Sequence, residues 1–178
     1  IGAIFQNWDV DSVIAESIFS EFAEMSGLEL NIEKTVGIPL WDGNIEDIKQ
    51  TLRSSERRWN NMSIAVEGTY LGFVVGPGRG RKSWEKPLKK YSQRCECWGG
   101  MGTGLMFSTI AYNTFASSTL GYIAQLVEPD ACVLAAEAQG LRRMLPGPGN
   151  WVRTEDAFHL KESFGQLHSF RSVSATAA

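Results

Sequence analysis

The sequence contains little cysteine and little histidine, with three cysteines and two histidines among 178 residues. An odd number of cysteines (Cys95, Cys97 and Cys132) does not form a disulfide framework and is typical of a reducing compartment. A metal site at Cys95-x-Cys97 would need more ligands than the scattered His159 and His168 offer. These shortages argue against a disulfide scaffold and against a structural zinc site.

The chain also lacks an initial methionine and a positively charged leader, so no secretory signal is visible. It begins at Ile1, and we expect it to be a piece of a longer protein. Without a signal, and with reduced cysteines, we predict an intracellular protein, either nuclear or cytoplasmic.

The sequence also has no charged residue from Cys97 to Val127. This run is long enough to cross a bilayer. However, hydroxyl and amide side chains interrupt it repeatedly, and no basic residues bracket it on one side. We expect two buried helices broken near Ser117 and Ser118, and no membrane partner. A membrane span remains the less favoured alternative and predicts solubility only in detergent.

The composition is typical of a folded protein, and the charge is unevenly distributed along the chain. Its hydrophobic content is 43%, with six tryptophans, which argues against disorder. Residues 1–75 carry five basic and twelve acidic groups, residues 76–94 seven and one, and residues 95–178 five and seven. Only the middle block has the charge expected for a polyanion partner.

That middle block follows a strand and a Gly/Pro turn and is predicted to be a helix with two unlike faces. The predicted apolar face consists of Trp84, Leu88, Tyr91, Cys95 and Trp98. The predicted basic face consists of Lys82, Lys86, Lys89, Lys90 and Arg94. We place Pro87 in the first turn, where a missing N–H costs least. A stiff helix that packs by its aromatic side and shows cations to water suits a phosphate backbone.

Two glycine-rich stretches and one acidic pair do not predict ligand sites. In GPGRGRKS (76–83), Arg81 replaces the glycine that a phosphate-binding loop requires before its lysine. In GGMGTG (99–104), no strand precedes the glycines, so we expect a joint. Asp9-x-Asp11 is better explained by helix caps than by a metal-binding pair.

The first 75 residues are predicted to mix helix and strand. Ile1–Trp8 is an apolar run typical of a buried strand. A helix follows, capped by Asp9 or Asp11 and closed by Gly27. Its expected core positions are Val13, Ile14, Ile18, Phe19, Phe22 and Met25. The remaining predictions are strands at 28–31 and 36–40, a helix from Asn44, and a hairpin of 63–66 with 69–75 around Glu67-Gly68.

The second half is predicted to be helical, which makes the fold class α+β. One helix starts at Pro129-Asp130 and ends at the Pro146–Gly149 turn. Another is capped by Thr154 and runs to about Phe164. The last ten residues, rich in Ser and Ala, are expected to be frayed or truncated.

Two blocks of the sequence have a familiar order. SGLELNIEKT (26–35) follows the predicted strand and helix, and GTYLGFVVG (68–76) follows about thirty residues later. This order resembles the C-terminal part of a reverse transcriptase of the non-LTR retrotransposon type. The resemblance implies the C-terminal part of a palm in residues 1–76 and a helical thumb-like region in residues 77–178.

The resemblance also implies roles for individual residues. Lys34 matches a lysine that protonates or steadies the pyrophosphate leaving group, in a turn shaped by Asn31 and Thr35. Tyr70, Leu71 and Gly72 match a hairpin that grips the primer end. The residues expected along the primer–template are Arg79, Arg81, Lys82, Lys86, Lys89, Lys90 and Arg94. The implied partners are an RNA–DNA hybrid, or an RNA template with its primer, and the remainder of the polymerase chain.

The chain departs from the family where the metal chemistry would lie. Such polymerases hold two Mg²⁺ ions on aspartates, which the resemblance places before Ile1 and on an earlier strand. We therefore expect no cofactor in this chain, Mg²⁺ in the full-length polymerase, and no polymerisation by this chain alone. Simpler interpretations stay open: a solvent-facing turn for Lys34, an ordinary hairpin, and a solvated helix surface. The alternative function is a non-catalytic helical protein-interaction module derived from a retroelement.

Overall fold

The structure, a computed structural model, describes residues 1–41, 43–54, 58–145, 147–148 and 151–177. It is an α+β fold, mostly helical, and divides into two compact units, Ile1–Gly80 and Arg81–Ala178. The turn at 76–80 belongs to the first unit, because the Gly78 N–H donates to the Val66 carbonyl (3.2 Å). The division falls a few residues after the boundary at 76/77 that the sequence suggests.

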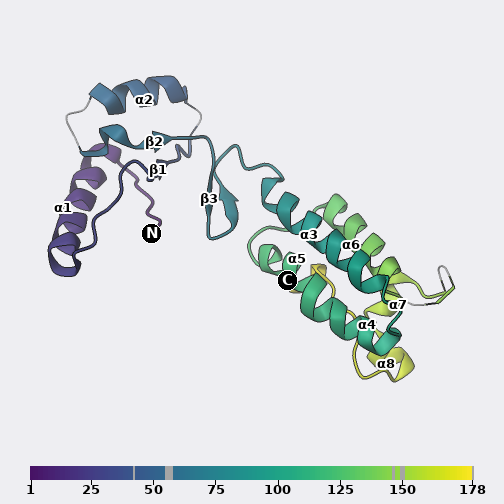
Figure 1. The fold of residues 1–178 in the computed structure, drawn as a ribbon. Coiled ribbons are helices and arrows are strands. Elements are labelled where there is room, and N and C mark those ends of the chain that lie inside the picture. Colours follow the sequence, from purple (N-terminus) through teal and green to yellow (C-terminus); the bar gives the residue numbers. More distant parts are fainter. Residues whose placement is uncertain (42, 55–57, 146, 149–150, 178) are drawn as a thin grey trace. The chain divides into compact units, whose positions relative to one another are not determined.

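Helix α1 (Trp8–Ser26; Figure 1) is capped by Asn7, so the prediction of an aspartate cap is wrong. The Asn7 side chain accepts a hydrogen bond from the Asp9 N–H (3.1 Å). The Asp11 carboxylate reaches back and accepts from the N–H groups of Gln6 (2.8 Å) and Asn7 (2.9 Å). Asn7 is the better cap because its side chain satisfies a donor of the first turn. Gly27 ends the helix in the left-handed conformation (φ 70°), as predicted.

The segment before α1 is not the buried strand that its apolar composition predicts. Ile1 is 93% exposed and Ile4 is 83% exposed. A strand needs a neighbour that accepts and donates backbone hydrogen bonds. Among the described residues, no strand pairs with Ile1–Trp8; residues 1–7 are irregular, and Trp8 is the first residue of α1.

The strands form two separate pairs. Strand β1 (Val36–Gly37) pairs in parallel with β2 (Ser63–Ile64), with Val36 opposite Ser63. Strand β3 (Gly68–Tyr70) pairs antiparallel with β4 (Phe73–Val75). The hairpin therefore turns at Leu71-Gly72, not at Glu67-Gly68, and the strand expected at 28–31 does not form.

The core of the first unit forms around Trp59, which is 3% exposed and lies in the 3-10 helix η1 (Arg58–Asn61). Its indole N–H donates to the Ser12 carbonyl (3.1 Å). Phe19 packs edge-on against the same ring, with centroids 6.3 Å apart. Leu52 joins this core from α2 (Ile45–Ser54), which begins, as predicted, at Asn44.

Helix α1 reaches this core with a different face from the predicted one. Ser12 and Ala15 are its buried residues, and Phe19 is half-buried. The other predicted core residues are exposed: Val13 (54%), Ile14 (53%), Ile18 (58%), Phe22 (44%) and Met25 (75%). Because the helix is apolar on more than one side, its periodicity did not identify the side that Trp59 covers. We call these five residues the outer apolar face of α1.

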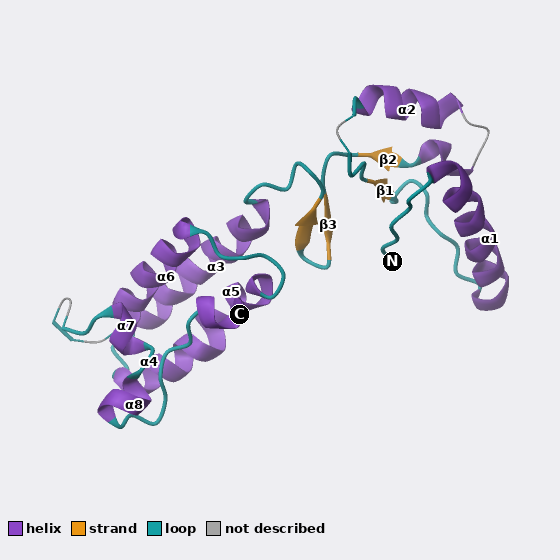
Figure 2. Cartoon of the chain, turned by 180° about the vertical axis from the view of Figure 1, so that it is seen from behind, coloured by secondary structure: helices purple, strands orange, loops and turns teal. Residues whose placement is uncertain are grey.

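In the second unit, α3 (Lys82–Gly99) packs along α6 (Ala131–Met144), as both views show (Figures 1 and 2). Two glycines permit the close approach. A Cβ on Gly140 would lie 2.3 Å from the Tyr91 hydroxyl oxygen, and one on Gly99 would lie 2.4 Å from the Arg143 carbonyl oxygen. Helix α6 starts, as predicted, at Asp130, whose carboxylate accepts from the Cys132 and Val133 N–H groups.

The uncharged stretch after α3 forms one helical rod with an irregular centre. It consists of α4 (Leu105–Ala111), the π-helix η2 (Tyr112–Ala116) and α5 (Ser117–Ala124). The expected break at Ser117-Ser118 is therefore wrong, because a wider turn absorbs the irregularity without ending the helix. In the described part of the chain, no helix has the length and apolar character needed to cross a bilayer.

The C-terminal segment is anchored by two buried residues, contrary to the prediction that it is frayed. Short helices α7 (Thr154–Ala157) and α8 (Leu160–Phe164) replace the single helix expected from Thr154 to about Phe164, and α9 (Ser174–Ala177) follows near the C-terminus. Thr154 is the first residue of α7 and not its cap. Phe170 is 2% exposed and Val173 1%. These two apolar residues hold the segment against the second unit. The Ser- and Ala-rich composition of the last ten residues gave no indication of this anchoring.

Candidate nucleic-acid interface

Helix α3 has the two unlike faces that its sequence predicts. Trp84, Tyr91 and Cys95 are buried, with at most 2% exposure. Burial raises the pKa of the Cys95 thiol to about 11, so this cysteine is protonated at neutral pH. Because these three buried side chains anchor α3 along its length, the exposed lysines of the opposite face are held in fixed positions on the helix.

Three of these lysines form a group that we call the lysine ridge: Lys86, Lys89 and Lys90. Their i, i+3 and i+4 spacing places them on one side of the helix. All three are exposed, and none makes an ion pair with a described residue. Lys82 lies one turn earlier on the same side and is also exposed. Three cations without acidic partners leave a local positive potential at this surface.

Pro87 lies inside α3, beyond its first turn, so its predicted position is wrong. A proline there has no N–H to donate to the carbonyl four residues earlier, that of Ser83. Trp84 on one side of the proline and Tyr91 on the other are both buried. Packing at both sites offsets the missing hydrogen bond and keeps the helix continuous.

Two of the predicted nucleic-acid contacts bind protein groups in this structure. The Arg81 guanidinium pairs with Asp130, at 2.6 Å from Nε to Oδ2 and 3.2 Å from Nη2 to Oδ1. Hydrogen bonding from the Val133 N–H, and the Arg81 charge, hold the pKa of the Asp130 carboxyl below its ordinary value. This ion pair joins the starts of α3 and α6.

Arg94 is the second of these residues. Its guanidinium donates to the carbonyl of Phe115 in the π-helix η2. The Phe115 ring also stacks on Trp98, with centroids 5.0 Å apart and planes within 6°. No sequence pattern predicts this link, because a π-turn is not visible in the periodicity.

The remaining predicted contacts lie in the first unit. In the β3–β4 hairpin, Leu71 (φ 48°) and Gly72 (φ 87°) both have positive φ, which is the pattern of a type I′ turn. Leu71 is 71% exposed and Tyr70 is 44% exposed. Arg79 is exposed in the turn that follows β4. A leucine in the left-handed region is strained, and this one presents its side chain at the hairpin tip.

Lys34 lies in a turn built by its neighbours. The Asn31 side-chain oxygen accepts from the Lys34 N–H (3.0 Å), and the Thr35 hydroxyl donates to the Asn31 carbonyl (2.8 Å). The Lys34 side chain is exposed and makes no ion pair with a described residue. No described hydrogen bond joins Lys34 to the hairpin.

The described residues do not fit a pair of Mg²⁺ ions. No three of their His, Cys, Asp and Glu side chains come together as metal ligands. The Asp11 carboxylate is already used by the backbone at the start of α1.

A second basic group, Lys49 and Arg53 on α2, was not predicted as a site. Its only signal in the sequence is the i, i+4 spacing of two cations in a polar helix.

Compared with known proteins, the chain matches no protein-family model, no curated protein and no solved structure.

Proposed function

We propose that this chain is part of an RNA-directed DNA polymerase of the non-LTR retrotransposon type and that it holds the primer–template. Residues 1–76 are assigned to the palm and residues 77–178 to the thumb. The lysine ridge is the observation that supports this proposal best. The two sequence blocks at 26–35 and 68–76 support the choice of family and the order of palm before thumb.

The ridge suits a nucleic-acid backbone for electrostatic reasons. Lys86, Lys89 and Lys90 replace the counterions that a duplex releases on binding. An A-form hybrid is recognised mainly through its backbone and shape, which needs positioned cations and no base reading. In this proposal Arg81 and Arg94 position α3 and make no direct contact with nucleic acid.

Three further roles follow from the same proposal. Lys34 supplies a cation to the pyrophosphate leaving group in the complete polymerase, where developing negative charge is stabilised by a positioned donor. The tip of the hairpin, Leu71-Gly72, contacts the primer end. The outer apolar face of α1 packs against the remainder of the polymerase, because an apolar surface of this kind marks an interface. The Mg²⁺ ions belong to that remainder, and the complete enzyme works in the nucleus or cytoplasm.

The test is binding of a labelled RNA–DNA hybrid, measured by fluorescence anisotropy between about 50 and 300 mM salt. In the variant K86Q/K89Q/K90Q the slope of log K against log salt should become smaller by roughly 2 to 3, close to one unit for each phosphate that a lysine no longer neutralises. Affinity at the lowest salt should fall at least about tenfold.

A matched control is R142Q/R143Q/K161Q, which removes the same charge from exposed positions of the second unit. It should bind almost as tightly as the unchanged chain. Equal losses in the two variants would show that net charge, and not the ridge, determines binding. Absence of hybrid binding by the unchanged chain would contradict the proposal.

The alternative, a non-catalytic helical interaction module derived from a retroelement, is favoured by one observation. Phe107, Phe115 and Tyr122 are 42–62% exposed along α4, η2 and α5. Exposed aromatic residues are enriched at protein interfaces. A protein partner at this face would stay bound after nuclease treatment and in high salt, and F107S/Y122S would release it. Hybrid binding would be unaffected by that variant under the polymerase proposal.

A further inference from the structure

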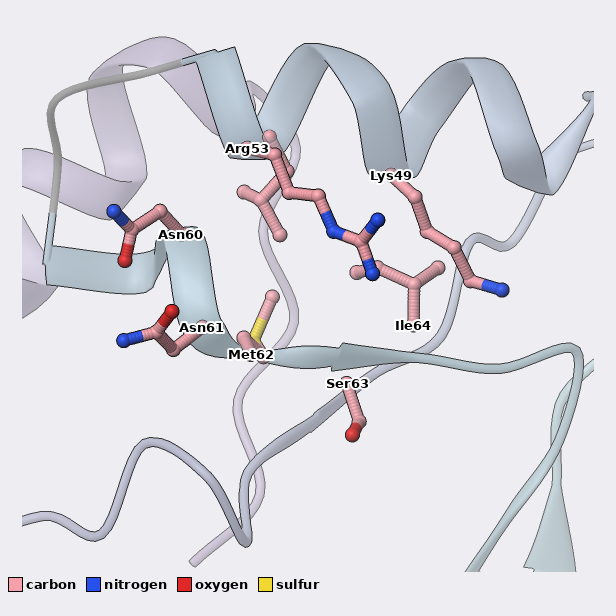
Figure 3. A pocket seen from close by; sticks show the side chains of 8 residues that line it. Lys49, Arg53, Asn60, Asn61, Met62, Ser63 and Ile64 are labelled. Atoms are coloured by element: carbon pink, nitrogen blue, oxygen red, sulfur yellow. The ribbon is translucent and has the colours of Figure 1, made fainter.

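The first unit contains a hollow of about 510 Å³ between α2 on one side and the η1–β2 segment on the other (Figure 3). This volume lies within the range of small-molecule sites. We call it the α2–β2 pocket. It is separate from the lysine ridge, from Lys34 and from the hairpin tip, none of which lines it.

Two cations on α2 face the pocket. Lys49 and Arg53 are one turn apart, and both side chains extend from α2 toward β2 (Figure 3). The Lys49 ammonium pairs with Glu46 at 2.8 Å. By contrast, no described residue accepts a hydrogen bond or an ion pair from the Arg53 guanidinium. Arg53 therefore offers a planar fork of donors that suits a phosphate group.

The rest of the lining is polar at one end and apolar beneath. Asn60 and Asn61, at the end of η1, add two amide groups. Leu52, Met62 and Ile64 provide apolar surface. None of the described residues that line the pocket is acidic, and Glu46, on the same helix as Lys49 and Arg53, is paired with Lys49.

We propose that the α2–β2 pocket binds a nucleoside phosphate. Arg53 binds the phosphate bidentately, with Lys49 contributing charge. Asn60 and Asn61 hydrogen-bond polar groups of the sugar or base. Leu52, Met62 and Ile64 contact the flat face of the base. The proposal stands on this pocket alone and does not depend on the polymerase assignment.

The experiment is a titration of the full chain, labelled with ¹⁵N, with adenosine diphosphate in constant salt. The side-chain amide signals of Asn60 and Asn61 should shift and saturate, with a dissociation constant of at most about 1 mM. Inorganic phosphate should compete more weakly, and adenosine without phosphate should give no saturating shift. These arms separate binding of a nucleoside phosphate from binding of any phosphate.

Arg53→Gln should weaken adenosine diphosphate binding about tenfold or more. Arg58→Gln removes a neighbouring exposed cation that does not line the pocket, and should change the affinity less than twofold. Undisturbed spectra of the Trp59 core would show that both variants fold. The proposal is overturned if the Asn60 and Asn61 signals do not move, or if the two variants weaken binding equally. K86Q/K89Q/K90Q should leave this titration unchanged, whatever its effect on hybrid binding.

Discussion

The Glu137 carboxylate accepts a hydrogen bond from the Val173 N–H at 2.7 Å, inside the second unit. Glu137 is 4% exposed on α6, and Val173 is 1% exposed near the C-terminus. The contact fastens the C-terminal segment to a helix that lies well before it in the chain. Asn113 in the π-helix adds two bonds to the same segment, to the Ser169 carbonyl and the Arg171 N–H (both 2.9 Å).

The Glu137 carboxyl predicts a pH dependence of stability. Burial raises its pKa above the ordinary value of 4.5, although the Val173 N–H acts in the opposite direction. A raised pKa in the folded state means that the contribution to stability is complete below about pH 4.5 and is lost as the pH rises through the folded-state pKa. Glu137→Gln keeps an acceptor for Val173 and removes the buried charge. Its free energy of unfolding relative to the unchanged chain should therefore increase from pH 4 to pH 8, measured by urea denaturation.

Glu137→Ala is the control for this prediction. It leaves the Val173 N–H without its acceptor, so it should destabilise the unit by about 1–3 kcal/mol at low pH. If Glu137→Gln instead showed the same pH profile as the unchanged chain, Glu137 would not be the titrating group.

Gly140 predicts a second effect on stability, through the contact between α3 and α6. In Gly140→Ala the new Cβ would lie 2.3 Å from the Tyr91 hydroxyl oxygen, which itself donates to the Glu137 carbonyl (3.0 Å). Overpacking of this kind costs typically about 1–3 kcal/mol. Gly121→Ala is a matched control on α5, where the nearest atom to a Cβ is 3.6 Å away. It should be neutral or stabilise by about 0.5–1 kcal/mol. Thermal denaturation of both variants decides the prediction.

The parts that could be predicted from the sequence depend on local interactions. Asn44 and Asp130 begin helices because each side chain accepts from N–H groups two or three residues later. Gly27 ends α1 because it adopts positive φ. The two faces of α3 follow from a spacing within one helix. Each of these needs only neighbouring residues, so each is visible in the sequence.

The parts that could not be predicted depend on residues far apart in the chain. β1 pairs with β2 across a whole helix, so the pairing of Val36 with Ser63 has no local signal. Asp130 engages Arg81, so one residue predicted to contact nucleic acid is bound to protein. The roles proposed for Lys34, the hairpin and the lysine ridge stay predictions that the binding experiments test.

The strained leucine at the hairpin tip gives a third prediction. Leu71 has φ 48° in a turn whose preferred sequence is Asn-Gly. Leu71→Asn should therefore stabilise the first unit by roughly 0.5–1 kcal/mol, since asparagine tolerates this conformation. Leu71→Ala keeps the unfavourable φ and should not. If the tip contacts the primer, both variants should weaken hybrid binding at constant salt, although only one of them is more stable.

The outer apolar face of α1 gives the last prediction. Ile14 and Ile18 are more than half exposed, so replacing them removes little buried surface. I14Q/I18Q should change the free energy of unfolding by less than about 0.5 kcal/mol, the range for surface positions. Trp59→Ala, on the side of α1 that is covered, should cost about 3–5 kcal/mol. Light scattering should show less self-association in I14Q/I18Q, because the chain then presents less apolar surface to other copies. A large loss of stability in I14Q/I18Q would mean that this face is buried in the folded chain, which contradicts the packing of α1 described here.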